Sequence, residues 1–219
     1  MNIAAYIDHT ILKPTTTNEE VLTLCQEALK FQFAAVCVPP NFVALAKSLL
    51  TNSEVKVATV IGFPFGYSNT AAKLAEINQA IEDGADELDM VHHLAALKNK
   101  DWELVEADVK ACTEACHRKG KIIKVIVESG LLTDDELLEC CKRYQHYPID
   151  FMKTSTGYAA VGATTHAVQL MRANLPETIA IKASGGIRNF SFAQELVLAG
   201  ANRLGCSASV SIATESQHN

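Results

Sequence analysis

Short apolar runs alternate with amphipathic segments along the 219 residues of the chain. Several of the apolar runs are nearly continuous, which is typical of parallel strands covered by helices. We predict strands at Tyr6–Leu12, Ala34–Val38, Val55–Gly62, Glu87–Val91, Ile122–Glu128, Phe151–Thr154, Ile179–Ala183 and Arg203–Cys206. Eight such strands, each followed by a helical pattern, favour one α/β domain over residues 1–219, folded as a (β/α)₈ TIM barrel.

The amphipathic segments carry signals for helix ends. The capping-box pattern occurs at Thr17–Glu20, Thr133–Glu136 and Ser191–Gln194, so we predict a helix start at each. Gly84, Gly120 and Gly200 stand where helices should stop. An open doubly wound sheet is the alternative fold, but no GxGxxG turn follows an early strand, which weakens a dinucleotide-binding version of it.

Composition narrows the classes of function. A net charge of −6 without a Lys/Arg run argues against a nucleic-acid surface. No apolar stretch approaches the roughly 18 residues of a membrane span, and the first residues lack the pattern of a secretory signal. Seven cysteines without a CxxC motif fit reduced thiols in a cytoplasmic protein.

Two lysines occupy equivalent places on neighbouring predicted strands. Lys153 and Lys182 each close an apolar run and are followed by glycine within four residues. A buried lysine must be paired or lose charge, and a neutral amine is a nucleophile toward carbonyls. Two charges ~4 Å apart repel by ~4 kcal/mol at an effective dielectric constant of ~20, which is enough to lower one amine's pKa. The pair therefore indicates Schiff-base chemistry, and the residues alone do not say which lysine is the nucleophile.

Other polar residues on the predicted strands are candidates for the same site. Asp89 is a candidate acid/base or lysine partner, and we expect Lys124 to pair with a carboxylate such as Asp89. Asp8, Thr10 and Cys37 are expected to line the mouth of the barrel, with Cys37 as a small apolar filler rather than a nucleophile.

The sequence offers candidate residues for two further kinds of site, one for a metal ion and one for phosphate. His92 and His93 follow Asp89 closely, but adjacent strand residues point to opposite sides, so we expect no metal there. Glycines and a serine after the last strands can instead present donors to a phosphate, since barrels of this type bind phosphate with the loops after strands seven and eight. These residues are Gly157, Gly185, Gly186, Gly205 and Ser207.

Together these segments resemble the deoxyribose-phosphate aldolases, a family of class I aldolases. The similarity extends from Ile7-Asp-His-Thr-Ile-Leu-Lys-Pro14 to Arg203-Leu-Gly-Cys-Ser207. Its most specific part is the pair Lys153-Thr-Ser-Thr-Gly157 and Lys182-Ala-Ser-Gly-Gly186, in this order and spacing.

The resemblance implies reversible cleavage of 2-deoxy-D-ribose 5-phosphate to acetaldehyde and D-glyceraldehyde 3-phosphate, without metal or cofactor. It places the Schiff base on Lys153, its activating lysine on Lys182 and the proton-relay aspartate on Asp89. The expected partner is a small phosphosugar, with neither nucleic acid nor membrane involved; a homodimer is one option that the sequence leaves open.

The chain departs from the family pattern in three places. Ala208 stands after Ser207 where a second serine is common, His92-His93 replaces a less ionisable segment, and Pro39-Pro40 replaces a commoner Asn-Pro. No role is assigned to the residues after the last short helix. The alternatives are another lysine-dependent phosphosugar aldolase or transaldolase and a non-catalytic phosphosugar-binding barrel.

Overall fold

In the computed structural model, which describes residues 1–217, eight parallel strands close into a barrel in sequence order. The last two residues of the predicted 1–219 domain lie outside this part. The strands are β1 (Ile7–Thr10), β2 (Ala35–Val38), β3 (Lys56–Ile61), β4 (Glu87–Val91), β5 (Ile122–Ile126), β6 (Phe151–Lys153), β7 (Ala180–Ser184) and β8 (Arg203–Cys206). The TIM-barrel prediction is confirmed, and the open sheet is excluded because β8 pairs with β1.

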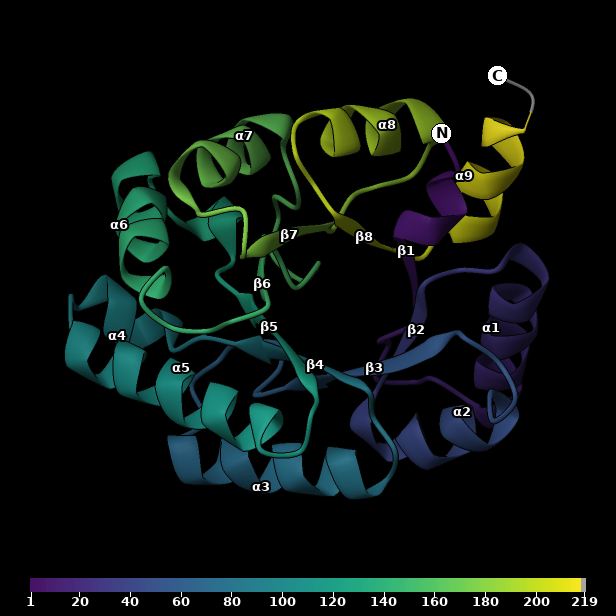
Figure 1. Cartoon of the computed structure of the whole chain (residues 1–219), viewed down its shortest axis with the longest axis horizontal. Helices are drawn as coiled ribbons and strands as arrows, with labels where there is room; N and C mark the ends of the chain where they lie inside the picture. The colour runs from purple at the N-terminus through teal and green to yellow at the C-terminus, as the bar shows by residue number, and fades with distance from the viewer. Residues whose placement is uncertain (218–219) are drawn as a thin grey trace.

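Helices surround the strands, as Figure 1 shows. They are α1 (Asn18–Phe31), α2 (Val43–Leu49), α3 (Thr70–Glu82), α4 (Leu94–Lys98), α5 (Trp102–His117), α6 (Asp134–Tyr144), α7 (Thr165–Asn174), α8 (Phe190–Leu198) and α9 (Ser209–Ser216), with 3₁₀ turns η1 (Ile3–Tyr6), η2 (Pro40–Phe42) and η3 (Ser129–Leu131). Within the described residues, no helix is both long and apolar enough to cross a membrane.

Two of the three predicted capping boxes are confirmed. Thr17 and Thr133 each accept a hydrogen bond from the backbone N–H three residues on, and the carboxylate of the glutamate there accepts one from the threonine backbone N–H. The prediction at Ser191 is wrong, because α8 starts earlier. Asn189 caps α8 by accepting from Phe192 N–H, so Ser191 lies inside the first turn.

The alternation of side chains along each strand divides the apolar residues into two cores. Outward-facing strand residues such as Leu88 and Met90 pack with the helices in one large cluster. A small separate cluster of Cys37, Ala58 and Val60 comes from β2 and β3. Charged residues of β1, β4, β5, β6 and β7 are buried as well, and they are described with the site below.

A buried ion pair joins α3 to α5. The Lys73 amine lies 2.5 Å from Asp108 Oδ2 and donates to the Val91 carbonyl at 2.9 Å, and both charged side chains are fully buried. Since Val91 is the last residue of β4, this pair holds the end of the strand that carries Asp89.

Replacing Lys73 with Met should destabilise the fold. The substitution leaves the Asp108 carboxylate buried without its cation, so the free energy of unfolding should fall by about 3–5 kcal/mol in urea denaturation. Lys98→Met is the matched control, because its partner Glu136 is part-exposed and the loss there should be at most about 1 kcal/mol. Equal losses in the two variants would contradict this account of the buried pair.

Candidate active site

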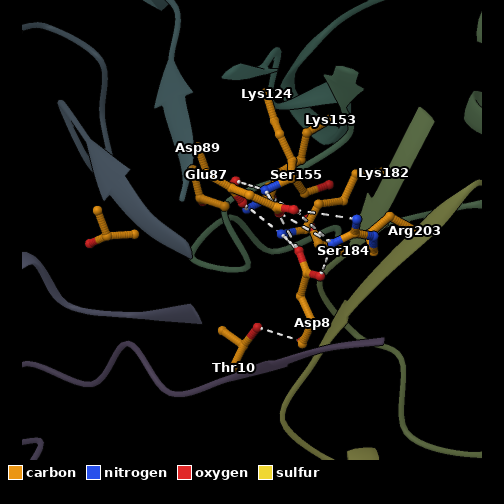
Figure 2. Close-up of polar contacts among 12 residues, drawn as sticks. Asp8, Thr10, Glu87, Asp89, Lys124, Lys153, Ser155, Lys182, Ser184 and Arg203 are labelled. Atoms are coloured by element: carbon orange, nitrogen blue, oxygen red, sulfur yellow. Dashed lines mark hydrogen bonds and ion pairs between the residues drawn. The ribbon is translucent and has the colours of Figure 1, made fainter. Parts of the chain in front are cut away.

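Four cations and three carboxylates lie together inside the barrel, and all of them are buried except Arg203, which is partly exposed. The cations are Lys124, Lys153, Lys182 and Arg203, and the carboxylates are Asp8, Glu87 and Asp89. Figure 2 shows the three amines gathered around Asp89. If every group were ionised, the cluster would carry one excess positive charge, so the deprotonation of one amine balances it.

Asp89 is the carboxylate that the three lysines share. Its Oδ2 lies 2.7 Å from the amines of both Lys153 and Lys182, and its Oδ1 lies 2.6 Å from that of Lys124. Burial opposes the ionisation of Asp89, but the charges of the three lysines outweigh it and hold its pKa well below the usual range. The prediction that Lys124 pairs with Asp89 is confirmed.

Lys153 and Lys182 are direct partners in the register of β6 and β7, as expected. Lys153 ends β6, whereas β7 continues two residues beyond Lys182 to Ser184. The side chain of Lys182 occupies the space beside Gly205, where a Cβ would come within 3.1 Å of Lys182 Cε. Gly205 therefore also makes room for this lysine within the barrel.

The two amines differ in their carboxylate partners. Lys182 contacts both Asp8 and Asp89, and these charges outweigh burial and raise its pKa above the ordinary value. Among the described residues, Lys153 forms an ion pair with Asp89 alone. Burial lowers the pKa of Lys153, Asp89 opposes this effect and the charge of Lys182 adds to it. Lys153 is therefore the amine that loses its proton more readily.

A cavity of about 650 Å³ opens above this cluster. Lys153 lines it, whereas in the described chain the other three cations of the cluster do not. All five residues predicted to bind phosphate line the same cavity: Gly157, Gly185, Gly186, Gly205 and Ser207. The amine of Lys153 and these residues, called the glycine-rich wall below, therefore line one cavity.

The supporting residues occupy different depths. Thr10 lines the cavity, as expected. Asp8 and Cys37 are fully buried and do not line it, so the expectation that they form the mouth is wrong. Asp8 instead accepts from Lys182 and from Arg203 at 2.6 Å. Cys37 packs with Ala58 and Val60, as a filler would, and burial raises the pKa of its thiol to about 11.

The adjacent histidines contact different parts of the fold. His92 Nδ1 lies 2.6 Å from the Tyr144 hydroxyl, while His93 Nδ1 accepts from Ala96 N–H and caps α4. Among residues 1–217, no cluster of three or more His, Cys, Asp or Glu side chains is arranged to hold a metal ion.

Several cavity residues were not predicted from the sequence. Thr156, Ser184 and Arg188 line the cavity although only their neighbours were assigned roles. The sequence pattern predicts Arg203 only as the start of a strand, yet it contacts Asp8 and Glu87. Their positions in the sequence are the signal that could have identified them, because each of these residues lies within or beside a segment that contains a predicted site residue.

The fold and the site define a TIM barrel that buries a pair of lysines on the neighbouring strands β6 and β7. Comparisons with known proteins give the family. Residues 2–208 match the DeoC/LacD family aldolase profile. The chain therefore belongs to the DeoC/LacD aldolase family, and the resemblance noted in the sequence is confirmed.

Individual relatives agree with this assignment. The chain is 47% identical to a deoxyribose-phosphate aldolase of Thermococcus kodakarensis, over 96% of this chain and 95% of that protein. It is 46% identical to one of Lactococcus lactis subsp. lactis, over 97% and 96%. Among solved structures, the tetrameric deoxyribose phosphate aldolase from Aeropyrum pernix has a TM-score of 0.91 at 32% identity, covering 98% of this chain and 91% of that one.

Removing the charge of Lys182 should raise the pKa of Lys153. Lys182→Met deletes the neighbouring ammonium that disfavours a proton on Lys153, so the Lys153 amine should stay protonated to higher pH. Competitive labelling with acetic anhydride across a pH series, followed by peptide mass spectrometry, measures this pKa. Lys124→Met is the control, since Lys124 contacts Oδ1 of Asp89 whereas Lys153 contacts Oδ2, and its effect should be smaller. An unchanged Lys153 pKa in Lys182→Met would contradict the electrostatic account.

Proposed function

We propose that this protein is a deoxyribose-phosphate aldolase that cleaves 2-deoxy-D-ribose 5-phosphate reversibly to acetaldehyde and D-glyceraldehyde 3-phosphate. The observation that carries the proposal is the position of Lys153, whose amine belongs to the buried charge cluster, has a lowered pKa and lines the cavity. A neutral amine in that position can attack the substrate aldehyde and lose water to form an iminium ion.

The charged groups around Lys153 serve the proton transfers. The iminium draws electrons from the bond between C2 and C3, which breaks to give the aldehyde product and an enamine on Lys153. Asp89, which contacts the nitrogens of both Lys153 and Lys182, accepts and returns protons at the carbinolamine and enamine stages. Lys182 stays charged and keeps Lys153 available as a nucleophile.

We assign the glycine-rich wall to the phosphate. Gly185 and Gly186 have left-handed φ of +86° and +78°, which allow the backbone to turn so that N–H groups face an anion. Ser207 adds a hydroxyl, and α9 begins just beyond it at Ser209 without a side-chain cap, so its first N–H groups are available.

The proposal extends to conditions and assembly. The iminium itself supplies the electron sink, so we propose a reaction without metal or organic cofactor. Seven free, buried cysteines in the described residues support a reducing cytoplasm as the location. A homodimer is the proposed minimal assembly; the relative from Aeropyrum pernix, described as tetrameric, gives one example of self-association in the family.

Borohydride trapping tests the function directly. Acetaldehyde with borohydride should add one ethyl group at Lys153, which peptide mass spectrometry locates, and Lys153→Ala should abolish both the label and the cleavage. Labelling at Lys182 alone, or full activity of Lys153→Ala, would overturn the assignment. A panel of other phosphosugars and ketone donors tests the alternative of a different aldolase or a transaldolase.

Asp89 should matter through proton transfer and not merely through its charge. Asp89→Asn should lower turnover by about 10²–10⁴-fold, the typical contribution of a positioned acid/base. Glu87→Gln is the matched control, because it removes a carboxylate of the same cluster that contacts Lys124 and Arg203 but neither Lys153 nor Lys182. Comparable losses in both variants, with circular dichroism showing intact folds, would reduce Asp89 to a structural ion.

The phosphate assignment gives a substrate-dependent prediction. A Cβ at Gly186 meets no atom within 4 Å, so the side chain of Gly186→Val should enter the cavity and raise KM for deoxyribose 5-phosphate, with little effect on unphosphorylated deoxyribose. Gly120→Val is the control for backbone strain, because Gly120 has φ +65°, equally open surroundings and no place in the cavity. Equal damage to both substrates in Gly186→Val would place the phosphate elsewhere.

The departure at Ala208 tests the same assignment in the opposite direction. Ala208 is the N-cap residue of α9, so a serine there supplies a hydroxyl beside the proposed phosphate position. Ala208→Ser should therefore lower KM for the phosphorylated substrate alone. An unchanged KM would mean that the added hydroxyl does not bind the phosphate.

A further inference from the structure

Glu128 is a buried carboxyl group that the steps above do not use. The described residues include five buried acidic side chains: Asp8, Glu87, Asp89, Asp108 and Glu128. The first four form ion pairs, and Glu128 forms none. It follows β5 in a left-handed conformation, φ 54° and ψ 56°, which a residue with a side chain adopts rarely.

The carboxyl group of Glu128 is bound to Thr156. It accepts from Thr156 N–H at 3.2 and 3.3 Å, and it accepts the Thr156 hydroxyl as well. The Thr156 oxygen in turn accepts from Tyr158 N–H at 3.0 Å. A hydroxyl has one proton to donate and two lone pairs. The Thr156 hydroxyl donates its proton to Glu128 and uses one lone pair to accept from Tyr158 N–H. One lone pair is therefore left to accept a hydrogen bond from a ligand.

Thr156 lines the same cavity as the reactive amine and the glycine-rich wall. It lies three residues after Lys153 and directly before Gly157, and all three residues line the cavity. A phosphosugar bound with its aldehyde at Lys153 and its phosphate at the glycines spans this position with its middle carbons. Those carbons carry the secondary hydroxyls of the substrate.

The chemistry of cleavage requires a proton acceptor at such a hydroxyl. When the bond between C2 and C3 breaks, the C3 hydroxyl becomes the carbonyl of the departing aldehyde and must lose its proton. Asp89 contacts the reacting nitrogen of Lys153, where it serves the imine and enamine steps, but it does not line the cavity in which the C3 hydroxyl lies. Burial raises the pKa of Glu128 above its ordinary value, opposed by the bonds from Thr156 and the charge of Lys153, which makes it a stronger base than an exposed glutamate.

We propose that Thr156 and Glu128 form a two-residue relay that accepts the proton of the substrate hydroxyl next to the breaking bond. Thr156 contacts the substrate, and Glu128 is a positioning residue that acts through Thr156. This inference rests on the proposed aldolase function and adds to it the group that deprotonates the C3 hydroxyl.

The step balances without any further reactant. The C3 hydroxyl gives its proton to Thr156 Oγ1 as the Thr156 proton passes to Glu128. The C3–O electron pair forms the new carbonyl, and the electrons of the C2–C3 bond form the enamine and neutralise the iminium. Glu128 ends as a neutral carboxylic acid, and it loses its proton to water through Thr156 once the aldehyde has left. In the synthetic direction the same acid protonates the new alkoxide.

Two measurements separate this step from the rest of the reaction. Exchange of the methyl hydrogens of acetaldehyde in D₂O, followed by NMR, requires imine and enamine formation on Lys153 but no hydroxyl substrate. Cleavage of deoxyribose 5-phosphate requires these steps and the relay. A residue with a merely structural role would affect both rates in parallel.

The test compares two disruptive variants with one conservative variant. Glu128→Gln keeps an oxygen that accepts from Thr156 but cannot take up a proton, and Thr156→Val removes the hydroxyl at nearly constant shape. Each should lower the kcat of cleavage by at least about 100-fold while methyl exchange stays close to the wild-type rate. Thr156→Ser restores the hydroxyl and should recover most of the cleavage.

Two results would overturn the relay. One is wild-type cleavage in Glu128→Gln, which would leave Glu128 as a simple hydrogen-bond acceptor. The other is a parallel loss of cleavage and exchange in both disruptive variants. Failure of the proposed function would look different, because the wild-type protein itself would then neither exchange acetaldehyde nor cleave the phosphosugar.

Discussion

The shared contact of three lysine amines with one aspartate is the interaction on which the site depends. A charge moved from water into a barrel interior is stable only if it is paired or neutralised. Asp89 pairs with Lys124, Lys153 and Lys182 together, and Asp8 and Glu87 supply the remaining negative charge. Because cations outnumber carboxylates by one, the cluster favours the loss of one proton. The amine that loses it is that of Lys153, which has one carboxylate partner, whereas Lys182 has two.

The barrel provides that selection through its register. β6 and β7 place Lys153 and Lys182 side by side, while β1 and β8 bring Asp8 and Arg203 to the side of Lys182. Lys182 is thereby fixed as a cation that does not line the cavity. Lys153 lines the cavity and has one carboxylate partner. The same strands end in the glycine-rich turns, so the reactive amine and the proposed phosphate position share one rigid framework. Glu128 and Thr156 follow β5 and β6, and Thr156 lines the same cavity.

Much of this arrangement could be predicted from local patterns. β4 and β8 have the predicted bounds. The lysine pair could be predicted because apolar runs followed by glycine are typical of the ends of barrel strands. The capping box at Ser191 was a wrong prediction because Asn189, two residues earlier, offered a competing cap. The depth of Asp8 and Cys37 could not be predicted, because it depends on the stagger between strands. The same is true of Arg203 and Glu128, whose partners lie far away in the sequence.

The protonation state of each lysine tests the central claim most directly. In protein labelled with ¹³C at the lysine ε carbon, an NMR titration follows each amine separately, and single Lys→Arg variants assign the signals. The account predicts that Lys153 titrates at a lower pH than Lys124 or Lys182, and that Lys182 remains charged throughout the range in which the chain is folded. Titration of Lys182 below Lys153 would contradict it, and would make Lys182 the amine that the charge cluster releases.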